Sequence, residues 1–418
     1  MATLPAAVSD VRPGAYRVLA LVAAAHAVNH AYTALLPILY PAMMAELGFG
    51  YRHLGLLIGV SQVFGQGLQF VTGYVGRFVQ RKVLLGVGTV AQGICFGLAG
   101  LSQSFLHLLA WQSLTRLAGS PQHPNGNALL LDYFGRTHRG RALAMHYAGG
   151  NLGTVLVPLV GALLLGAFGW RTTLASFGLP AIVIGLLVLV GITEERGGQA
   201  TLEARPSLGR ETLEILRNRN LRFIVGAQAT AAGGRGLGVV ITFVPLYLSQ
   251  ELGLGVMKMG ALYTLMLIGS VVGPTLAGFV SDRLRARKPV LLGAYLASTL
   301  TMVLLVNLGT AGAWLLPLVV FILGCVAYAE SPMLQSLTAD ATEGSSQDVV
   351  FGLYHTIGFG TGALWAIVMG TLVEALGFRP ALYVMAASYS AAALWLLPLR
   401  MPSGAVAPDM PRATERAR

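Results

Sequence analysis

A small number of ionisable side chains interrupt the long apolar runs of this 418-residue chain, and these side chains are best able to do chemistry. Glu330 is the acid that lies clearly inside such a run. A buried carboxyl group that also faces an arginine is balanced between its neutral and charged forms, so it can take up and release a proton. The sequence therefore predicts proton coupling at Glu330, with a static salt bridge as the alternative.

Arg235 is a basic residue in a run of the same kind, and it stands between glycines in Gly233-Gly234-Arg235-Gly236. A guanidinium group stays charged and fits carboxylate or phosphate groups. The small neighbours leave room for a ligand to approach, so the sequence predicts that Arg235 binds substrate. The alternative is a buried ion pair with Glu330, and both interpretations hold if that pair can open.

Two histidines, His26 and His30, are four residues apart and so share one face of a helix. Asn29 and Tyr32 add polarity next to them. Because histidine titrates near neutral pH, His30 is a candidate for proton transfer or for the lining of a cavity. Two histidines alone are a weak signal for a metal, so we expect neither a metal site nor a cofactor unless other histidines converge on the pair. Those other histidines are His123, His146 and His355.

Further polar and aromatic residues lie within the apolar runs. Gln62, Gln66 and Gln69 form a polar stripe on one helix face, which lines a cavity or joins helices through hydrogen bonds. Packing is the alternative role for the histidines other than His30 and for each single aromatic residue, which can also be an anchor at the membrane surface. The candidate substrate-binding residues are Arg235, His26, His30, Asn29, Gln62, Gln66, His123, Asn151, Tyr328, Tyr354 and Trp365.

The composition places these residues in a lipid bilayer. The chain is 55% hydrophobic and 11% charged, whereas a soluble domain carries roughly 25% charged residues. Apolar runs of about 20 residues recur along the chain, and in lipid such runs must form helices. The net charge of +11 is explained by basic residues in alternate connections, so no nucleic-acid partner is expected. We find no phosphate-binding loop of the ATPase type and no nucleophile-base set, so the sequence argues against an enzyme.

We predict an all-α membrane protein with twelve transmembrane helices. Basic connections follow the second, fourth, sixth and eighth spans, which predicts cytoplasmic termini for a multi-pass protein of the inner membrane. The predicted parts are an N-terminal six-helix bundle (1–193), a cytoplasmic linker (194–219), a C-terminal six-helix bundle (220–399) and a disordered tail (400–418). The predicted spans are 16–43, 54–77, 83–101, 106–131, 141–165, 171–193, 220–248, 259–281, 289–309, 314–338, 349–375 and 379–399.

The two predicted bundles repeat each other at an offset of 205 to 208 residues. Leu36-Pro37 matches Val244-Pro245, and Gly169-Trp170-Arg171 matches Gly377-Phe378-Arg379. A membrane protein with two similar halves is most often a transporter, because two packed halves can rock about a site between them. The repeat therefore predicts a binding site near the midplane of the bilayer.

The connection after the second span of each half carries a motif of glycine and charged residues. In the second half this motif has Gly278, Asp282 and Arg283, followed by Arg287 and Lys288. By these residues the chain resembles the major facilitator superfamily over essentially its whole length. The resemblance implies two pseudo-symmetric six-helix bundles, with a charge latch at the cytoplasmic face.

The first half departs from this motif, because Arg77 stands where the family has an aspartate and Gln80 replaces a glycine. Arg77 cannot act as the acid of a latch. Asp132 and Asp340 lie near cytoplasmic helix ends, and we expect them to pair with nearby arginines. The candidate gating residues are Asp282, Arg283, Arg77, Asp132 and Asp340.

The fourth span contains Arg116-Leu117-Ala118-Gly119, which is similar to the family's next motif, an arginine followed by a close glycine. The resemblance implies that Arg116 influences proton coupling or draws an anionic substrate, with a structural role as a donor to backbone carbonyls as the alternative. Residues 119–127, 139–142 and 149–153 are similar to fosmidomycin-resistance-type exporters within the family.

Together these residues lead to one expectation and several alternatives. Two deep arginines against one deep acid favour a small polar or anionic organic substrate, moved by a monomeric secondary transporter that works by alternating access. The resemblance to exporters favours proton-coupled export. The alternatives are proton-coupled uptake of an organic anion, a receptor or scaffold that transports nothing, and a metal transporter that uses His30.

Overall fold

The computed structural model describes residues 11–76, 78–135, 138–194, 217–231, 239–308, 312, 314–342 and 347–400. This part of the chain is helical apart from its connections and one isolated β-bridge between Val11 and Phe134, which confirms the predicted all-α class. The described residues form two compact units. Unit 1 contains those within Met1–Glu203, Leu237–Leu267 and Gly362–Ala381, and unit 2 contains those within Ala204–Gly236, Ile268–Thr361 and Leu382–Arg418.

Several predicted features lie outside the described residues. They include Arg77, Arg235, most of the predicted linker and the tail after Arg400. The predicted boundaries of the bundles, the linker and the tail therefore stay a prediction.

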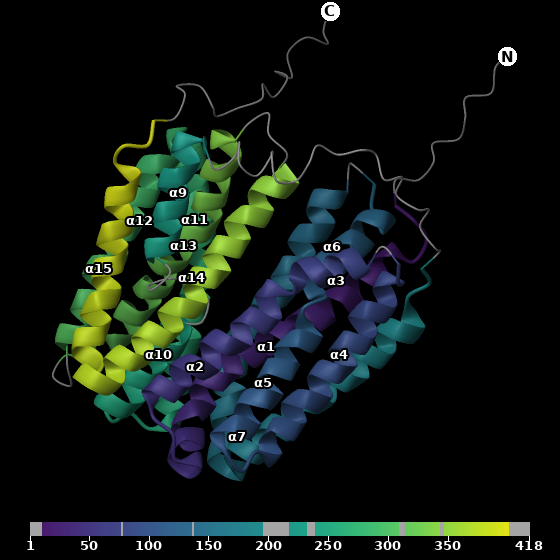
Figure 1. Cartoon of the computed structure of the whole chain (residues 1–418), viewed down its shortest axis with the longest axis horizontal. Helices are drawn as coiled ribbons and strands as arrows, with labels where there is room; N and C mark the ends of the chain where they lie inside the picture. The colour runs from purple at the N-terminus through teal and green to yellow at the C-terminus, as the bar shows by residue number, and fades with distance from the viewer. Residues whose placement is uncertain are drawn as a thin grey trace, which may run out of the picture. The chain divides into compact units, whose positions relative to one another are not determined.

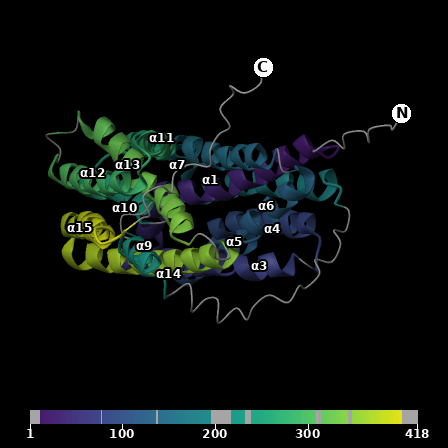
Figure 2. The same ribbon diagram turned by 90° about the horizontal axis from the view of Figure 1, so that it is seen from above.

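The described part of unit 1 has α1 at its centre, packed extensively against α7, and α7 in turn packs against α4 (Figures 1 and 2). α7 joins the fifth and sixth predicted spans, and Gly169 breaks it with a φ of 74°, a conformation that suits glycine. The helices of the first half are α1 (Ala15–Leu47), α2 (Tyr51–Gln62), α3 (Gln69–Val75), α4 (Arg81–Leu98), α5 (Phe105–Gly119), α6 (Gln122–Tyr133) and α7 (Arg139–Gly191).

Unit 1 also contains α10 (Val240–Leu246), the first part of α11 (Val256–Leu284) and the last part of α14 (Gln347–Leu376). α14 approaches α2 closely in this unit, since a Cβ added at Gly55 would lie 2.5 Å from the carbonyl oxygen of Ala366. Segments far apart in the sequence therefore share one compact body.

Unit 2 holds the other helices, and within it α12 packs extensively against α13. α11 lies with its backbone against α13, because a Cβ added at Gly273 would lie 1.9 Å from the carbonyl oxygen of Cys325. Thr299 links α12 to α15 by donating to the carbonyl oxygen of Ala386 at 3.2 Å. The remaining helices are α9 (Arg219–Ala231), α12 (Arg287–Leu308), α13 (Leu316–Ala341) and α15 (Phe378–Leu396).

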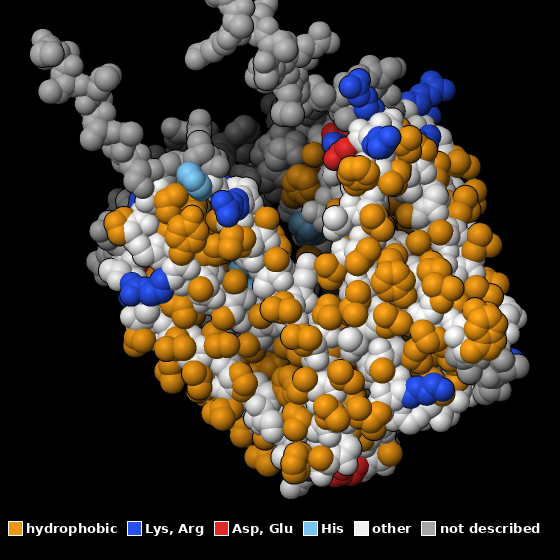
Figure 3. Space-filling view, turned by 180° about the vertical axis from the view of Figure 1, so that it is seen from behind, with side chains coloured by type: hydrophobic (Ala, Val, Ile, Leu, Met, Phe, Trp, Pro, Cys, Tyr) orange, Lys and Arg blue, Asp and Glu red, His pale blue; other side chains and the backbone are white. Residues whose placement is uncertain are grey.

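The surface of these helices is apolar. Within the described residues, eight helices are long and apolar enough to cross a membrane. Figure 3 shows hydrophobic side chains over most of one face, with few charged ones among them. Leu163, Leu300 and Leu394 are each more than half exposed. Water-soluble monomers rarely expose large continuous apolar patches, whereas lipid is a good solvent for them, so the protein is a multi-pass membrane protein.

Two of the predicted spans are broken rather than continuous. The second becomes α2, a π-helical turn at Val63–Gly67, and α3. The fourth becomes α5 and α6, with a bend at Ser120 and Pro121 where one helix ends and the next begins. Proline has no backbone N–H to donate, and π-helical turns occur frequently at functional sites, so both breaks mark places where the helix departs from regular hydrogen bonding.

The predicted repeat is visible in matching polar contacts of the two halves. Arg81 forms an ion pair with Asp132, and Arg287 forms one with Asp340, as expected for these two acids. In the same way, Arg171 pairs with Glu46 at 2.8 Å and Arg379 pairs with Glu251 at 3.5 Å. Lys82 donates to the carbonyl oxygen of Ile192, near the end of the first half. Lys288 donates to those of Leu397 and Leu399, near the end of the second half.

Candidate functional site

Three histidines from two helices of unit 1 converge. α1 supplies His26 and His30, one helical turn apart, and α6 supplies His123. The ring centroids lie 4.5 Å apart for His26 and His30, 5.0 Å for His26 and His123, and 6.1 Å for His30 and His123. One nitrogen of each ring lies within 4.8 Å of the other two. We call these three residues the histidine cluster.

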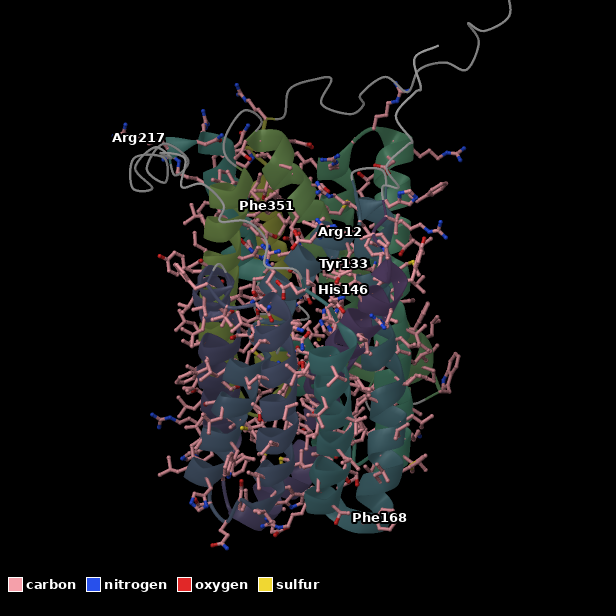
Figure 4. The ribbon with its side chains drawn as sticks, turned by 90° about the vertical axis from the view of Figure 1, so that its right-hand side faces the viewer. Arg12, Tyr133, His146, Phe168, Arg217 and Phe351 are labelled. Carbon is pink, nitrogen blue, oxygen red and sulfur yellow. The ribbon has the colours of Figure 1, made fainter. Side chains whose placement is uncertain are left out.

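α7 adds a fourth histidine beside the histidine cluster. The ring of His146 stacks on that of His26 with centroids 4.2 Å apart and an interplanar angle of 19°. Figure 4 shows His146 deeper in unit 1 than Arg12 and Tyr133, with Phe168 at the far end of the helical body, beside the break of α7 at Gly169. His26 and His146 are each about 99% buried or more, whereas His30 and His123 are partly exposed. The site therefore has a fully buried side at His26 and His146 and a less buried side at His30 and His123.

Glycines on α7 allow this convergence. A Cβ at Gly153 would lie 2.2 Å from the carbonyl oxygen of Ala27, and one at Gly150 would lie 2.8 Å from Cε1 of His26. α7 and α1 are therefore in backbone contact beside the rings, as small residues allow in membrane helices. Nδ1 of His26 donates to the carbonyl oxygen of His146 at 3.2 Å, a bond that fixes the ring against α7.

Arg116 lies next to this region on α5. Its Nη1 donates to Oγ1 of Thr33 at 2.8 Å, one turn along α1 from His30. Among the residues that the structure describes, no carboxylate lies within 4.0 Å of the guanidinium. Gly65 of the π-helical turn packs on the stem of Arg116, since an added Cβ would be 3.1 Å from its Cβ. The charge is thus held in place by a neutral hydroxyl group and retains donors for an anion.

The other candidates in unit 1 are less closely gathered. Asn29 donates to the carbonyl oxygen of Gly119 at 3.3 Å, so it joins α1 to α5. Gln69 donates to Gln66 at 2.5 Å at the break between α2 and α3, and Gln62 lies before that break. Asn151 is exposed, and Trp365 is half-buried in the part of α14 that belongs to unit 1.

Glu330 lies in unit 2, where it is only 1% exposed on α13. It interacts electrostatically with Tyr389 of α15, which in turn interacts with Tyr328 of α13. Tyr354 on α14 is fully buried in the same unit, and His355 packs on Phe359 rather than on the histidine cluster. Glu330 is therefore a buried acid that acts electrostatically on the phenol of Tyr389.

The candidate gating residues separate into two kinds. Asp132 and Asp340 form the ion pairs with arginine that the sequence predicted. Asp282 and Arg283 are exposed at the end of α11, and neither has an ion pair with another described residue. The predicted gating roles of Asp282 and Arg283 stay predictions.

Three contributors to these sites were not identified from the sequence: Thr33, Tyr389 and Thr154, whose Oγ1 lies 3.4 Å from Nδ1 of His30. His146 was named only as one of the histidines that would have to converge on His26 and His30. Thr33 follows His30 by three residues and so shares its helix face, a signal that was available. Thr154 and Tyr389 come from distant helices, and no spacing in the sequence connects them with His30 or Glu330. Only the packing of the helices brings those pairs together.

The comparisons with known proteins agree with this architecture. The sequence profile of the Major Facilitator Superfamily matches residues 22–366 and 224–416. The chain is 24% identical over 384 residues to an uncharacterised MFS-type transporter, YfnC, of Bacillus subtilis, covering 90% of this chain and 91% of the relative. It is 24% identical over 373 residues to the fosmidomycin resistance protein of Escherichia coli, covering 86% and 87%.

The fold is similar to that of solved transporters. A bacterial homologue of the human lysosomal transporter Spinster matches with a TM-score of 0.74 at 16% identity, over 93% of this chain and 96% of that one. The predicted fold is thus confirmed, and the proteins that share it here are transporters rather than enzymes. The chain belongs to the Major Facilitator Superfamily, whose members are alternating-access membrane transporters.

Proposed function

We propose that this transporter moves a small polar or anionic organic molecule across the inner membrane and that proton-coupled export is its direction. The observation that supports an anionic substrate is Arg116, a guanidinium inside the helical body of unit 1 that donates a hydrogen bond to the neutral hydroxyl of Thr33. Such a group binds carboxylate or phosphate oxygens strongly because it is charged and only partly occupied by hydrogen bonds. Similarity to the fosmidomycin resistance protein supports export.

Each bundle has its own part in this proposal. In unit 1, Arg116 and the polar face of α1, with Asn29, His26 and His30, contribute to the substrate site. In unit 2, Glu330 takes up and releases the proton, because it is a carboxyl group buried on α13 that acts electrostatically on the phenol of Tyr389. The termini are placed in the cytoplasm, as the basic connections indicate.

The experiment is flux in proteoliposomes with an imposed pH gradient. Fosmidomycin is the first probe, since a relative of this protein is named for resistance to it. A thermal-shift screen of organic anions supplies further probes, because a ligand that binds the folded state raises the melting temperature. We expect a proton gradient to drive flux of at least one such anion.

A pair of variants then tests the proton role. Glu330→Gln should abolish flux driven by the pH gradient and leave exchange of substrate for substrate intact, because the amide cannot carry a proton. Glu330→Asp keeps the acid and is the matched control, so it should retain part of the driven flux. Full pH-driven flux in Glu330→Gln would show that Glu330 is not the proton carrier. If the unchanged protein moves none of the anions, the alternative of a receptor that transports nothing is favoured.

A further inference from the structure

We propose that the histidine cluster, His26, His30 and His123, is a binding site for a divalent transition-metal ion, with Zn²⁺ as the best-suited ion. One nitrogen of each ring lies within 4.8 Å of the other two. In a tetrahedral zinc site with Zn–N bonds of 2.0–2.1 Å, ligand nitrogens are about 3.4 Å apart. The rings therefore need to move together by roughly 1 Å, which side-chain rotations supply without a change of backbone.

The hydrogen bond of His26 leaves one ring nitrogen able to bind such an ion. Metal-binding histidines generally donate their other ring N–H to a backbone carbonyl or carboxylate, which fixes the tautomer and the ring orientation. Nδ1 of His26 has this arrangement with the carbonyl oxygen of His146. Nε2 of His26 is then the nitrogen with a free lone pair, and it is buried with no hydrogen-bond partner among the described residues.

His30 has the same arrangement with a side chain. Its Nδ1 lies 3.4 Å from Oγ1 of Thr154. That hydroxyl group donates its own proton to the carbonyl oxygen of Gly150 at 3.0 Å. The hydroxyl oxygen is therefore left to accept the Nδ1–H of His30, and Nε2 of His30 becomes the ligand. Two of the three rings are thus oriented by bonds of the kind that metal sites use.

The neighbourhood of the cluster also favours a ligand. The two ring nitrogens of His146 are buried and meet no hydrogen-bond partner within the described part of the chain. Buried polar atoms are costly unless a water, ion or ligand meets them. His26 and His146 close the inner side of the cluster, while the partial exposure of His30 and His123 gives an ion a way in.

The ligand set selects the kind of ion. Three imidazoles suit Zn²⁺, Ni²⁺ and Cu²⁺, whereas Ca²⁺ and Mg²⁺ require oxygen ligands. Three protein ligands leave the fourth tetrahedral position for water or for an oxygen of another molecule. Arg116 acts electrostatically on His30, and its positive charge opposes a dication. We therefore expect an affinity near the micromolar range, weaker than that of structural zinc sites.

The test is zinc binding to the whole protein in detergent. The protein is purified through an affinity tag that contains no histidine. Isothermal titration should show one Zn²⁺ per chain. His30→Gln and His123→Gln should each lower the affinity at least tenfold. The matched controls are His53→Gln and His107→Gln, exposed histidines of the same unit, and they should bind as the unchanged protein does. Failure of stoichiometric zinc binding, or unchanged binding in His30→Gln and His123→Gln, would overturn the site.

A second measurement uses the unchanged protein and does not depend on whether the variants fold. X-ray absorption at the zinc edge should show three imidazole nitrogens at 2.0–2.1 Å from the bound ion. A shell of oxygen atoms with fewer than two imidazoles would contradict the proposal. The inference does not rest on the direction or driving ion of transport, because zinc binding is measured without flux and the flux assay is run without added zinc.

Discussion

Arg116 and Thr33 are joined by a hydrogen bond of 2.8 Å from the guanidinium to the hydroxyl group, which links α5 to α1. A threonine hydroxyl neutralises no charge, so the remaining donors of Arg116 suit an anion. We expect Arg116→Lys to keep part of the transport of an anionic substrate and to raise its KM by about tenfold. Lysine keeps the positive charge but lacks the planar guanidinium that binds two oxygens at once. Arg116→Gln should abolish transport.

The measurement is the concentration dependence of initial flux in proteoliposomes. Arg141→Gln is the control, since Arg141 is an exposed arginine in the same unit. If Arg116→Gln transports as well as Arg141→Gln does, Arg116 has the structural role that the sequence left open.

The two matching ion pairs should differ in their effect on stability. The side chains of Arg287 and Asp340 are 22% and 17% exposed, whereas those of Arg81 and Asp132 are 31% and 42% exposed. A less exposed charged hydrogen bond is screened less by water. We expect Asp340→Asn to cost about 1.5–3 kcal/mol and Asp132→Asn to cost less than about 1 kcal/mol. Melting temperatures in detergent at low and high salt measure these losses of stability. An equal loss in the two variants would show that exposure does not determine how much each ion pair stabilises the protein.

These ion pairs were predictable from the sequence. The repeat places a basic residue at the start of one helix and an acid at the end of the next in each half, and charges at neighbouring helix ends are within reach of each other. That pattern predicted arginine partners for the two acids, and the structure identifies them as Arg81 for Asp132 and Arg287 for Asp340. The apolar runs likewise predicted the helical class, because lipid leaves the backbone few other structures.

The sequence showed that a metal site would require other histidines to converge on His26 and His30, but it did not show that they do. Spacing placed His26 and His30 on one face of a helix, but His123 and His146 reach them through the packing of α1, α6 and α7. That packing depends on particular glycines such as Gly150 and Gly153, and the composition, with 53 glycines, does not tell which of them lie at a helix contact. The break of the second span also has no local signal strong enough to predict it, because glycines are frequent in all the spans.

The approach of α14 to α2 in unit 1 depends on glycine as well. A Cβ added at Gly370 would lie 2.3 Å from the carbonyl oxygen of Tyr51, and one at Gly55 would lie 2.5 Å from that of Ala366. We expect Gly370→Ala and Gly55→Ala each to cost about 1–3 kcal/mol, because the helix backbones must move apart. Gly362→Ala is the control on α14, as nothing lies within 4 Å of its added Cβ. Melting temperatures compare the three, and equal values would mean that the two helices separate at no cost.

The hydroxyl group of Thr154 should tune metal binding without being a ligand. It is placed to accept the Nδ1–H of His30 at 3.4 Å, so it turns Nε2 of that ring toward the histidine cluster. Thr154→Val keeps the shape of the side chain and removes this acceptor. Loss of such an orienting partner typically weakens metal affinity by 10- to 100-fold, so we expect a zinc affinity lowered by about tenfold or more with the stoichiometry of one unchanged. Thr154→Ser keeps the hydroxyl group and should restore binding. A Thr154→Val protein that binds zinc as tightly as the unchanged one would show that His30 is oriented by its packing alone.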